Sequence, residues 1–221
     1  MAPEMIRVLT VATGEGGHWA SFLRSCRRVG IEPEVIGWGQ PYRGHTYRLK
    51  LLHRYLAEMP PEQTILFLDG WDSVVLAGQE EIEARYLAFD VPLLMSAERY
   101  CAPFPWLAER FPVIESPYRH VNAGNWIGQA GYVRALWERM GLWRLPDALN
   151  DQGVLTDWFL SHPGEIVLDH RCELFQNLYI SEGDIDYSGE RPRNIVTGGS
   201  PVLFHGSGGA DMRAVLASLN L

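Results

Sequence analysis

The chain has 221 residues, of which 47% are hydrophobic, and a formal net charge of −8 at pH 7. This length and hydrophobic fraction suit one α/β domain, residues 1–221, with a sizeable core. The acidic balance disfavours nucleic acid as a partner, because binding to a phosphate backbone needs a basic face.

The first half of the chain alternates between short apolar segments and amphipathic segments. The apolar segments 6–12, 34–38, 64–68 and 92–96 are typical of buried strands. Helices are predicted at 18–29, across 51–59 and at 79–89. Strands that alternate with helices predict a mostly parallel central sheet with helices on both faces.

The second half is less regular. Its glycine-punctuated segment 121–129 is either a strand or a bulged turn. Helices are predicted at 131–140, after Asn150 as the N-cap, and at 211–219, with short strands at 166–168, 174–175 and 202–204. The polar segment 181–200 is long for a connection, and such loops are more often lids or disordered segments.

Two carboxylates follow the strand at 64–68, in the sequence Asp69-Gly70-Trp71-Asp72. An Asp-x-x-Asp pair after a buried strand is a common way to hold a divalent cation. Mg²⁺ and Mn²⁺ prefer carboxylate oxygen and often share their remaining positions with phosphates. The alternative is a turn whose acids cap the next segment, because motif matches carry false positives.

Several polar residues are predicted to follow strands at the edge of the sheet where ligands of open α/β folds bind. His205 follows the last strand and precedes Gly206-Ser207-Gly208-Gly209, whose backbone amides suit a phosphate. With Asp69 and Asp72 it would form a mixed oxygen and nitrogen set that suits Mn²⁺ better than zinc. The alternatives are a satisfied polar histidine and a flexible connection to the last helix. The other residues predicted at this edge are Thr13, Trp38 and Glu98.

Other phosphate-binding motifs fit poorly. No Walker-type GxxxxGK[ST] loop occurs, and residues 13–17 lack the spacing of a dinucleotide fingerprint. Aspartyl-phosphate hydrolases need Asp-x-Asp-Gly, whereas Gly70 here directly follows the first aspartate.

Seven segments in one order resemble the glycosyltransferase domain of the procollagen lysyl hydroxylases, and more distantly the collagen galactosyltransferases. The resemblance covers roughly residues 7–208, and its most specific part is Asp-His-Arg-Cys followed by Phe-Gln-Asn-Leu. The segments are 10–13, 67–72, 96–98, 122–128, 150–152, 168–178 and 204–206.

The resemblance implies a GT-A-type, Rossmann-like nucleotide-sugar-binding fold, a UDP-sugar donor and Mn²⁺, with Mg²⁺ as the alternative. It also implies transfer of a hexose, glucose or galactose, to a hydroxyl acceptor. By position, Asp69 and Asp72 match the metal-binding pair of the family, and His205 matches its third ligand. The acceptor is unknown: a protein, a glycan or a small molecule.

Further residues are assigned to the donor. By the resemblance, Thr13 and Trp71 fall where the family holds the nucleotide, with Trp71 in place of a tyrosine, and Trp38 would join them in holding the uridine. The candidates for the diphosphate are Arg48, where the family has a lysine, and the amides of Gly206 and Ser207.

Four further residues are assigned to the sugars. Asn122 and Asn125 flank Gly124 and would line the donor sugar pocket with it, or the two asparagines satisfy a bulge. Asp151 is the catalytic candidate, as a base on the acceptor hydroxyl or as a residue that holds sugar hydroxyls. The family has a denser run of aspartates here, of which this chain keeps Asp147 and Asp151.

Two other functions compete with glycosyl transfer. One is an inactive nucleotide-sugar-binding scaffold, and the other is a metal-dependent phosphohydrolase or nucleotidyltransferase that uses the same aspartates. Residues 1–10 lack the pattern of a signal peptide, and the three cysteines are widely spaced, so we expect a cytoplasmic protein. No run of about 18 apolar residues predicts a transmembrane helix.

Overall fold

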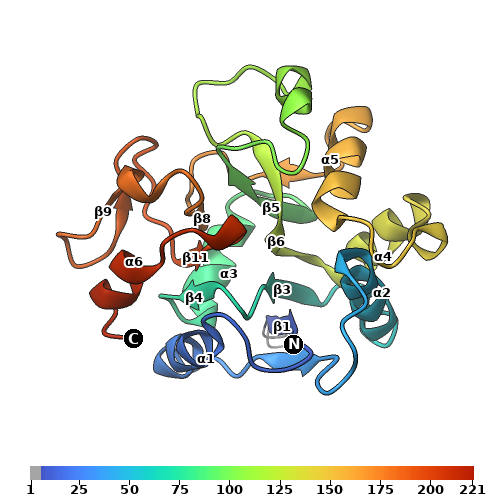
Figure 1. Cartoon of the computed structure of the whole chain (residues 1–221), viewed down its shortest axis with the longest axis horizontal. Helices are drawn as coiled ribbons and strands as arrows, with labels where there is room; N and C mark the ends of the chain where they lie inside the picture. Colours follow the sequence, from blue (N-terminus) through green and yellow to red (C-terminus); the bar gives the residue numbers. More distant parts are fainter. Residues whose placement is uncertain (1–5) are drawn as a thin grey trace.

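The computed structural model describes residues 6–221, which form a central six-stranded sheet between two layers of helices (Figure 1). The strand order is β2-β1-β3-β6-β5-β7. The strands are β1 (Arg7–Val11), β2 (Glu34–Ile36), β3 (Thr64–Leu68), β5 (Leu93–Glu98), β6 (His120–Gln129) and β7 (Val167–Leu168).

The sheet is mixed. Its β1–β2, β1–β3 and β5–β7 pairs are parallel, and β6 is antiparallel to both β3 and β5. The prediction of a mostly parallel sheet is therefore right for the other strands and wrong for β6. The reason is the connection 99–119, which contains only a short 3₁₀ helix, η1 (Pro105–Arg110), and returns to the edge where β5 ends. As a result β6 begins at the edge where β3 and β5 end.

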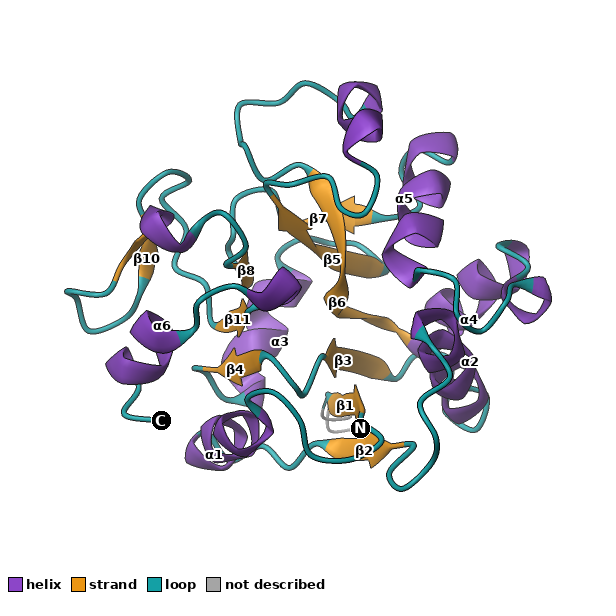
Figure 2. Cartoon of the chain, in the orientation of Figure 1, coloured by secondary structure: helices purple, strands orange, loops and turns teal. Residues whose placement is uncertain are grey.

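Helices cover both faces of the sheet, as the sequence predicts (Figure 2). One core cluster joins the sheet to α2 (His45–Leu56), α4 (Ala130–Arg139) and α5 (Asp151–Ser161). The other joins it to α1 (Trp19–Arg28) and α3 (Gln79–Leu87). In α2 the spacing of Leu49, Leu52 and Leu56 puts all three on one helix face, and all are fully buried.

A second, three-stranded sheet lies beside the first. It has the order β4-β11-β8, built from β4 (Ser73–Val75), β11 (Leu203–His205) and β8 (Phe175–Asn177). β11 pairs antiparallel with β4 and parallel with β8. This pairing puts His205 opposite Ser73 and Asn177, and so brings the end of the chain against the turn that follows β3.

The segment 181–200, predicted to be a lid or disordered, has its own structure. It contains the 3₁₀ helix η3 (Glu182–Asp184) and an antiparallel pair of β9 (Ile185–Asp186) and β10 (Arg193–Asn194). The side chain of Asn194 is fully buried and donates to Gln176 Oε1 over 2.8 Å. Asp184 accepts from Arg99 and from the Tyr118 hydroxyl, so the segment is tied to the rest of the protein.

The Asp-His-Arg-Cys motif after β7 builds a turn. Asp169 is fully buried, and its carboxylate accepts from the backbone N–H groups of Glu173, Leu174 and Phe175 over 2.9, 2.7 and 2.9 Å. These bonds orient the entry into β8. Asp169 is thus structural, the role that its position after a strand favours.

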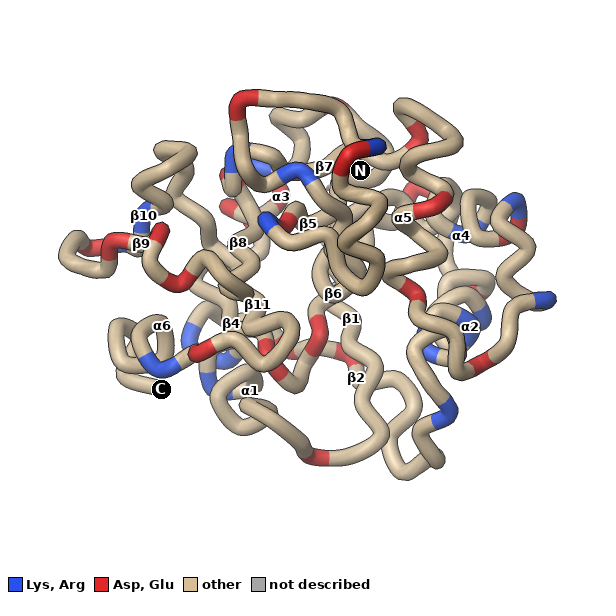
Figure 3. The backbone as a smooth tube through the Cα atoms, turned by 45° about the horizontal axis from the view of Figure 1, so that its top comes forward, with Lys and Arg blue, Asp and Glu red and all other residues tan. Residues whose placement is uncertain are grey.

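Charged side chains are spread over several elements, without a single basic stripe in the view of Figure 3. Within residues 6–221, no helix is both long and apolar enough to cross a bilayer. The expected lack of a signal peptide falls partly on residues 1–5, which lie outside the described residues. The last helix, α6 (Arg213–Ser218), packs on β4 and β11.

We expect Asp169→Ala to lower the free energy of unfolding by about 3 kcal/mol or more, because it leaves three buried N–H groups without their acceptor. Denaturant titration measures the change. The exposed acid Glu109 serves as the control, and its alanine variant should stay within about 0.5 kcal/mol of the parent. Equal stability of both variants would contradict the structural role of Asp169.

Candidate functional site

A cleft of about 400 Å³ opens at the edge where β3 and β5 end and β6 begins. It contains most of the residues that the sequence analysis selected. Those that line it are Arg48, Asp69, Asp72, Glu98, Asn122, Gly124, Asp151, His205 and Ser207. Those outside its lining are Thr13, Trp38, Trp71 and Gly206.

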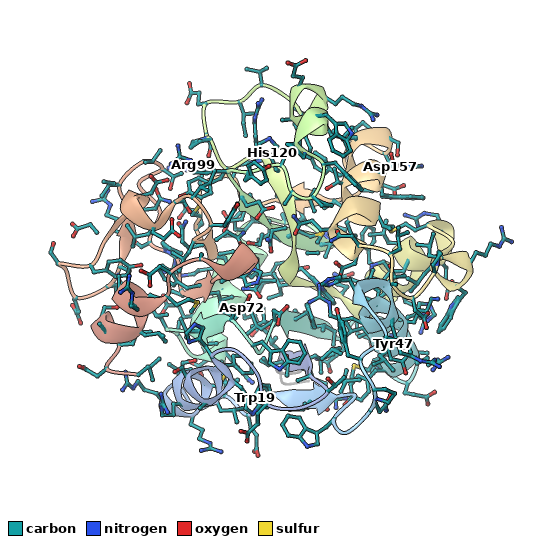
Figure 4. The ribbon with its side chains drawn as sticks, in the orientation of Figure 1. Trp19, Tyr47, Asp72, Arg99, His120 and Asp157 are labelled. Atoms are coloured by element: carbon teal, nitrogen blue, oxygen red, sulfur yellow. The ribbon has the colours of Figure 1, made fainter. Side chains whose placement is uncertain are left out.

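Asp69, Asp72 and His205 come together in this cleft. One ligand atom from each side chain lies within 4.8 Å of the other two. Asp69 follows β3 directly, Asp72 precedes β4, and His205 ends β11. Figure 4 places the labelled Asp72 near the centre of the view. Two carboxylates and one imidazole make a donor set that suits a divalent cation such as Mn²⁺ or Mg²⁺.

One buried oxygen tests whether a cation fits there. Asp72 Oδ1 lies 3.0 Å from His205 Nε2, which can pair with it only when the imidazole is protonated; with a neutral imidazole this oxygen has no hydrogen bond among the described residues. A buried carboxylate oxygen without a partner is costly unless a bound group satisfies it. A cation held by Asp69, Asp72 and His205 supplies that partner, so the residues fit a metal ion.

The pKa values in the cluster follow from burial and from neighbouring charges. Burial and the carboxylate of Asp72 raise the pKa of Asp69. Burial also opposes the ionisation of Asp72, but the charge of His205 outweighs it and lowers the pKa of Asp72. Burial disfavours the imidazolium of His205, whereas Asp72 outweighs this effect and raises its pKa. A proton on His205 therefore competes with a metal ion for the same place.

Two amide oxygens hold the other nitrogen of His205. His205 Nδ1 lies 3.0 Å from Asn122 Oδ1 and 2.9 Å from Asn177 Oδ1. Because both partners are acceptors, the ring keeps a proton on Nδ1 and, when neutral, offers the lone pair of Nε2 to a ligand. Asn177 was not selected as a site residue; its one signal was its place in the Phe-Gln-Asn-Leu motif.

Gly124 is required by the histidine. A Cβ atom at this position would lie 2.0 Å from His205 Cε1, so the imidazole packs directly on the backbone of β6. Gly124 also accepts from the Asp69 amide through its carbonyl, over 2.9 Å. The glycine thus positions two of the three metal-ligand candidates, while its expected place in a donor sugar pocket stays a prediction.

Asn125, the next residue, supports the aspartate turn. Its side-chain oxygen accepts from the Asp69 amide over 3.1 Å and from the Ser73 hydroxyl over 3.0 Å. It is fully buried and does not line the cleft. Asn125 therefore has a structural role.

Arg48 joins the metal cluster to α5. Its guanidinium donates to Asp69 Oδ2 over 2.8 Å and lies 2.5 Å from Asp151 Oδ2. Burial disfavours the charge of Arg48, but the carboxylates of Asp151 and Asp69 outweigh it and raise its pKa further. The guanidinium lines the cleft, and its contact with a diphosphate stays a prediction.

Both carboxylate oxygens of Asp151 already have donors. Oδ2 accepts from Arg48, and Oδ1 accepts from the backbone amide of Gln152 over 2.8 Å. The residue is 2% exposed at the start of α5, where Asn150 caps the helix as predicted. These contacts favour a role in holding Arg48 over the predicted role as a base.

The rings of Trp71, Tyr42 and His45 form an aromatic row that runs from the turn after β1 to the cleft. Trp71 donates through its indole N–H to the Gly14 carbonyl over 2.9 Å. The ring centroids of Trp71 and Tyr42 are 6.2 Å apart, and those of Tyr42 and His45 are 6.0 Å apart. His45 lies on the cleft wall. Trp38 is half exposed and instead packs on Trp19 at 5.3 Å. Tyr42 was missed because it lies in an irregular loop.

The sequence analysis predicted that the amides of Gly206 and Ser207, after β11, contact a diphosphate. The amide of Gly206 donates to the Asp72 carbonyl over 2.7 Å, so that amide has a partner within the protein. A Cβ at Gly206 would lie 2.2 Å from Met212 Sδ, and the glycine is there for packing. The Ser207 hydroxyl, in contrast, is buried without a partner among the described residues and belongs to a cleft-lining residue.

Comparison with solved structures defines the class of protein. The galactosyltransferase LgtC with donor and acceptor sugar analogues superposes with a TM-score of 0.55 at 13% identity, over 92% of this chain and 87% of that one. Mouse xyloside xylosyltransferase 1, in its apo form, gives 0.52 at 14% identity, over 93% and 99% of the two chains. The chain therefore has a GT-A glycosyltransferase fold.

Sequence comparison identifies the family. The model of the PLOD GT domain matches residues 2–220, and the chain belongs to that family of glycosyltransferase domains. The multifunctional procollagen lysine hydroxylase and glycosyltransferase LH3 of Rattus norvegicus is 28% identical over 93% of this chain. Procollagen-lysine,2-oxoglutarate 5-dioxygenase 1 of Bos taurus is 30% identical over 91% of it. The chain spans about 30% of the length of these relatives.

We expect Gly124→Ala to weaken Mn²⁺ binding by at least about tenfold, because the added methyl group displaces the imidazole of His205. Titration calorimetry with MnCl₂ measures the affinity. Gly183→Ala is the matched control, since a Cβ there meets nothing within 4 Å. Equal Mn²⁺ affinity of the two variants would contradict the placement of His205 in a metal site.

Proposed function

We propose that this domain transfers a hexose, glucose or galactose, from a UDP-sugar to a hydroxyl acceptor in a reaction that depends on Mn²⁺. The observation that carries the proposal is the Asp69–Asp72–His205 cluster, whose buried Asp72 Oδ1 has no hydrogen bond among the described residues while His205 is neutral. Membership of a glycosyltransferase family supports the reaction type. The cluster supports the metal, with Mg²⁺ as the alternative.

The metal ion would neutralise negative charge on the diphosphate leaving group. The chain's own residues prepare the place for it. Asn122 and Asn177 hold the His205 ring with Nε2 facing Asp72, and Arg48 favours the charged form of Asp69. Because these groups are fixed before a donor arrives, little reorganisation is needed when charge develops.

The aromatic row and the Ser207 hydroxyl suit the remaining parts of the donor. A uracil ring is flat, and the rings of Trp71 and Tyr42 offer faces for stacking beside the cleft. The Ser207 hydroxyl lies on the metal side of the cleft and has no other partner among the described residues. It is the candidate for a contact with the diphosphate in place of the Gly206 amide.

The acceptor side is formed by Tyr100 and Tyr179, whose rings meet edge to face at 5.6 Å on the cleft wall. These rings and Pro103 line the cleft, and we assign this wall to the hydroxyl-bearing group of a protein, a glycan or a small molecule. Collagen is not assumed as the acceptor. The cytoplasmic location likewise stays a prediction.

The test is a calorimetric titration of UDP into the purified protein, with and without Mn²⁺. Saturable UDP binding that requires Mn²⁺ is the expected result and justifies a screen of donor sugars. Absence of binding under both conditions would contradict the proposal. Mn²⁺-dependent UDP binding without turnover of any UDP-sugar would favour the inactive scaffold. Equal binding of other nucleoside diphosphates would favour the phosphohydrolase.

We expect Asp72→Ala to lower Mn²⁺-dependent turnover by at least about 100-fold, because the metal loses a ligand and with it several kcal/mol of charge stabilisation. Hydrolysis or transfer of a UDP-sugar is measured at saturating Mn²⁺, with thermal unfolding as a check on folding. The control is Asp157→Ala, an exposed acid on α5 (Figure 4), which should keep parental turnover. Parental turnover in Asp72→Ala would remove the metal assignment.

A further inference from the structure

Glu98 is a buried carboxylate that the proposed chemistry has not used. It is the last residue of β5, only 2% exposed, and it lines the cleft. Its two oxygens bond two different amide side chains. Asn122 Nδ2 donates to Oε2 over 3.1 Å, and Gln152 Nε2 donates to Oε1 over 2.6 Å. Glu98 thus connects the start of β6 with the start of α5.

The first of these bonds fixes which way the Asn122 amide points. An ionised carboxylate only accepts, so the NH₂ group of Asn122 must face Glu98. The amide oxygen then faces the other way, where it accepts from His205 Nδ1 over 3.0 Å and from the Gly124 amide over 2.9 Å. That orientation keeps the histidine proton on Nδ1 and leaves Nε2 facing Asp72 at 3.0 Å.

The second bond prevents Glu98 from turning away. Gln152 Nε2 also donates to the Ala102 carbonyl over 2.9 Å, and its oxygen accepts from the Ala123 amide over 3.1 Å. A flipped Gln152 would face a carbonyl with its oxygen and an N–H with its NH₂ group, so its orientation is fixed. Glu98 therefore meets an N–H donor on both oxygens.

Burial raises the pKa of Glu98 to about 7, while Asn122, His205 and Gln152 act in the opposite direction and favour the carboxylate. Above neutral pH the carboxylate form prevails, and the pattern of donors and acceptors described above is complete. Because the two amides bond both oxygens, Glu98 is poorly placed to act as a base on a substrate.

We propose that Glu98 is a positioning residue for the metal site, which acts through Asn122 and, together with Asn177, holds the His205 ring with its proton on Nδ1 and Nε2 toward Asp72. The inference rests on the proposed metal-dependent function. It assigns Glu98 a role at a distance from the cation: the residue touches no proposed metal ligand and controls one of them through a single amide. If Glu98 only anchored α5, its bond to Gln152 would be sufficient and its bond to Asn122 would have no function.

The test is Glu98→Gln, studied as the whole domain at pH 8. Glutamine presents one oxygen and one NH₂ group to two N–H donors, so one contact becomes repulsive. Since Gln152 is fixed by its other bonds, Asn122 is the amide that turns. Its NH₂ group then faces His205 Nδ1 and the Gly124 amide, so that of the two amide oxygens only Asn177 Oδ1 still accepts from Nδ1, and the ring is held less firmly with Nε2 toward Asp72. We expect Mn²⁺ affinity, measured by titration calorimetry, to fall by about 10- to 100-fold.

A second substitution distinguishes the positioning role of Glu98 from a general effect of Glu98→Gln on folding. In the double variant Glu98→Gln with Asn122→Asp, the NH₂ group of the glutamine donates to one oxygen of the aspartate. The other oxygen of the aspartate still accepts from His205 Nδ1. The net charge of the pair is unchanged, so the double variant should recover most of the lost affinity. Asn122→Asp alone should bind Mn²⁺ more weakly than the double variant does, because the carboxylate of Glu98 then faces the new carboxylate at position 122.

Asp184→Asn is the control for the loss of a buried carboxylate, since Asp184 bonds Arg99 and Tyr118 outside the metal cluster. It should bind Mn²⁺ as the parent does. If the parent binds no Mn²⁺, the proposed function fails. If the parent binds Mn²⁺ and Glu98→Gln binds it equally well, or the double variant recovers nothing, the role of Glu98 is overturned.

Discussion

The antiparallel pairing of β11 with β4 is the constraint on which the site depends. It joins residues 73–75 to residues 203–205, and it sets His205 beside the turn that carries Asp69 and Asp72. The Gly206 amide extends this pairing by its bond to the Asp72 carbonyl over 2.7 Å. Without it, Asp72 would lose the imidazole that lies 3.0 Å from its Oδ1, and Arg48 would be left to offset the repulsion between the two acids.

The local elements could be predicted from the sequence because each has a clear periodicity or cap. The helix face of Leu49, Leu52 and Leu56 and the cap at Asn150 are examples. The direction of β6 could not be predicted, because it depends on where the connection 99–119 re-enters the sheet. Strand order and direction are set by long-range contacts, which a local pattern does not encode.

The charged members of the site and Asn122 were predictable, and the amides of Asn177 and Gln152 were not. Asp69, Asp72 and His205 stand out because acids after a strand and a histidine before a glycine run are uncommon local patterns. Asn177 and Gln152 act only through partners far away in the chain, such as His205 and Glu98. Gly206 was predicted to contact phosphate because it begins a glycine run. In the structure its amide donates to the Asp72 carbonyl, and Met212 packs against its Cα.

The bridge that Arg48 makes between Asp69 and Asp151 has a consequence for assembly. An acid cluster that depended on a metal ion for neutralisation would resist folding until the ion arrived, as in small zinc domains. Here a guanidinium from α2 supplies positive charge from within the chain, and Asp72 raises the pKa of His205 and so favours the imidazolium form beside it. We therefore expect the sheet edge to form first and to accept the ion afterwards, so that the ion can leave and return without unfolding the domain.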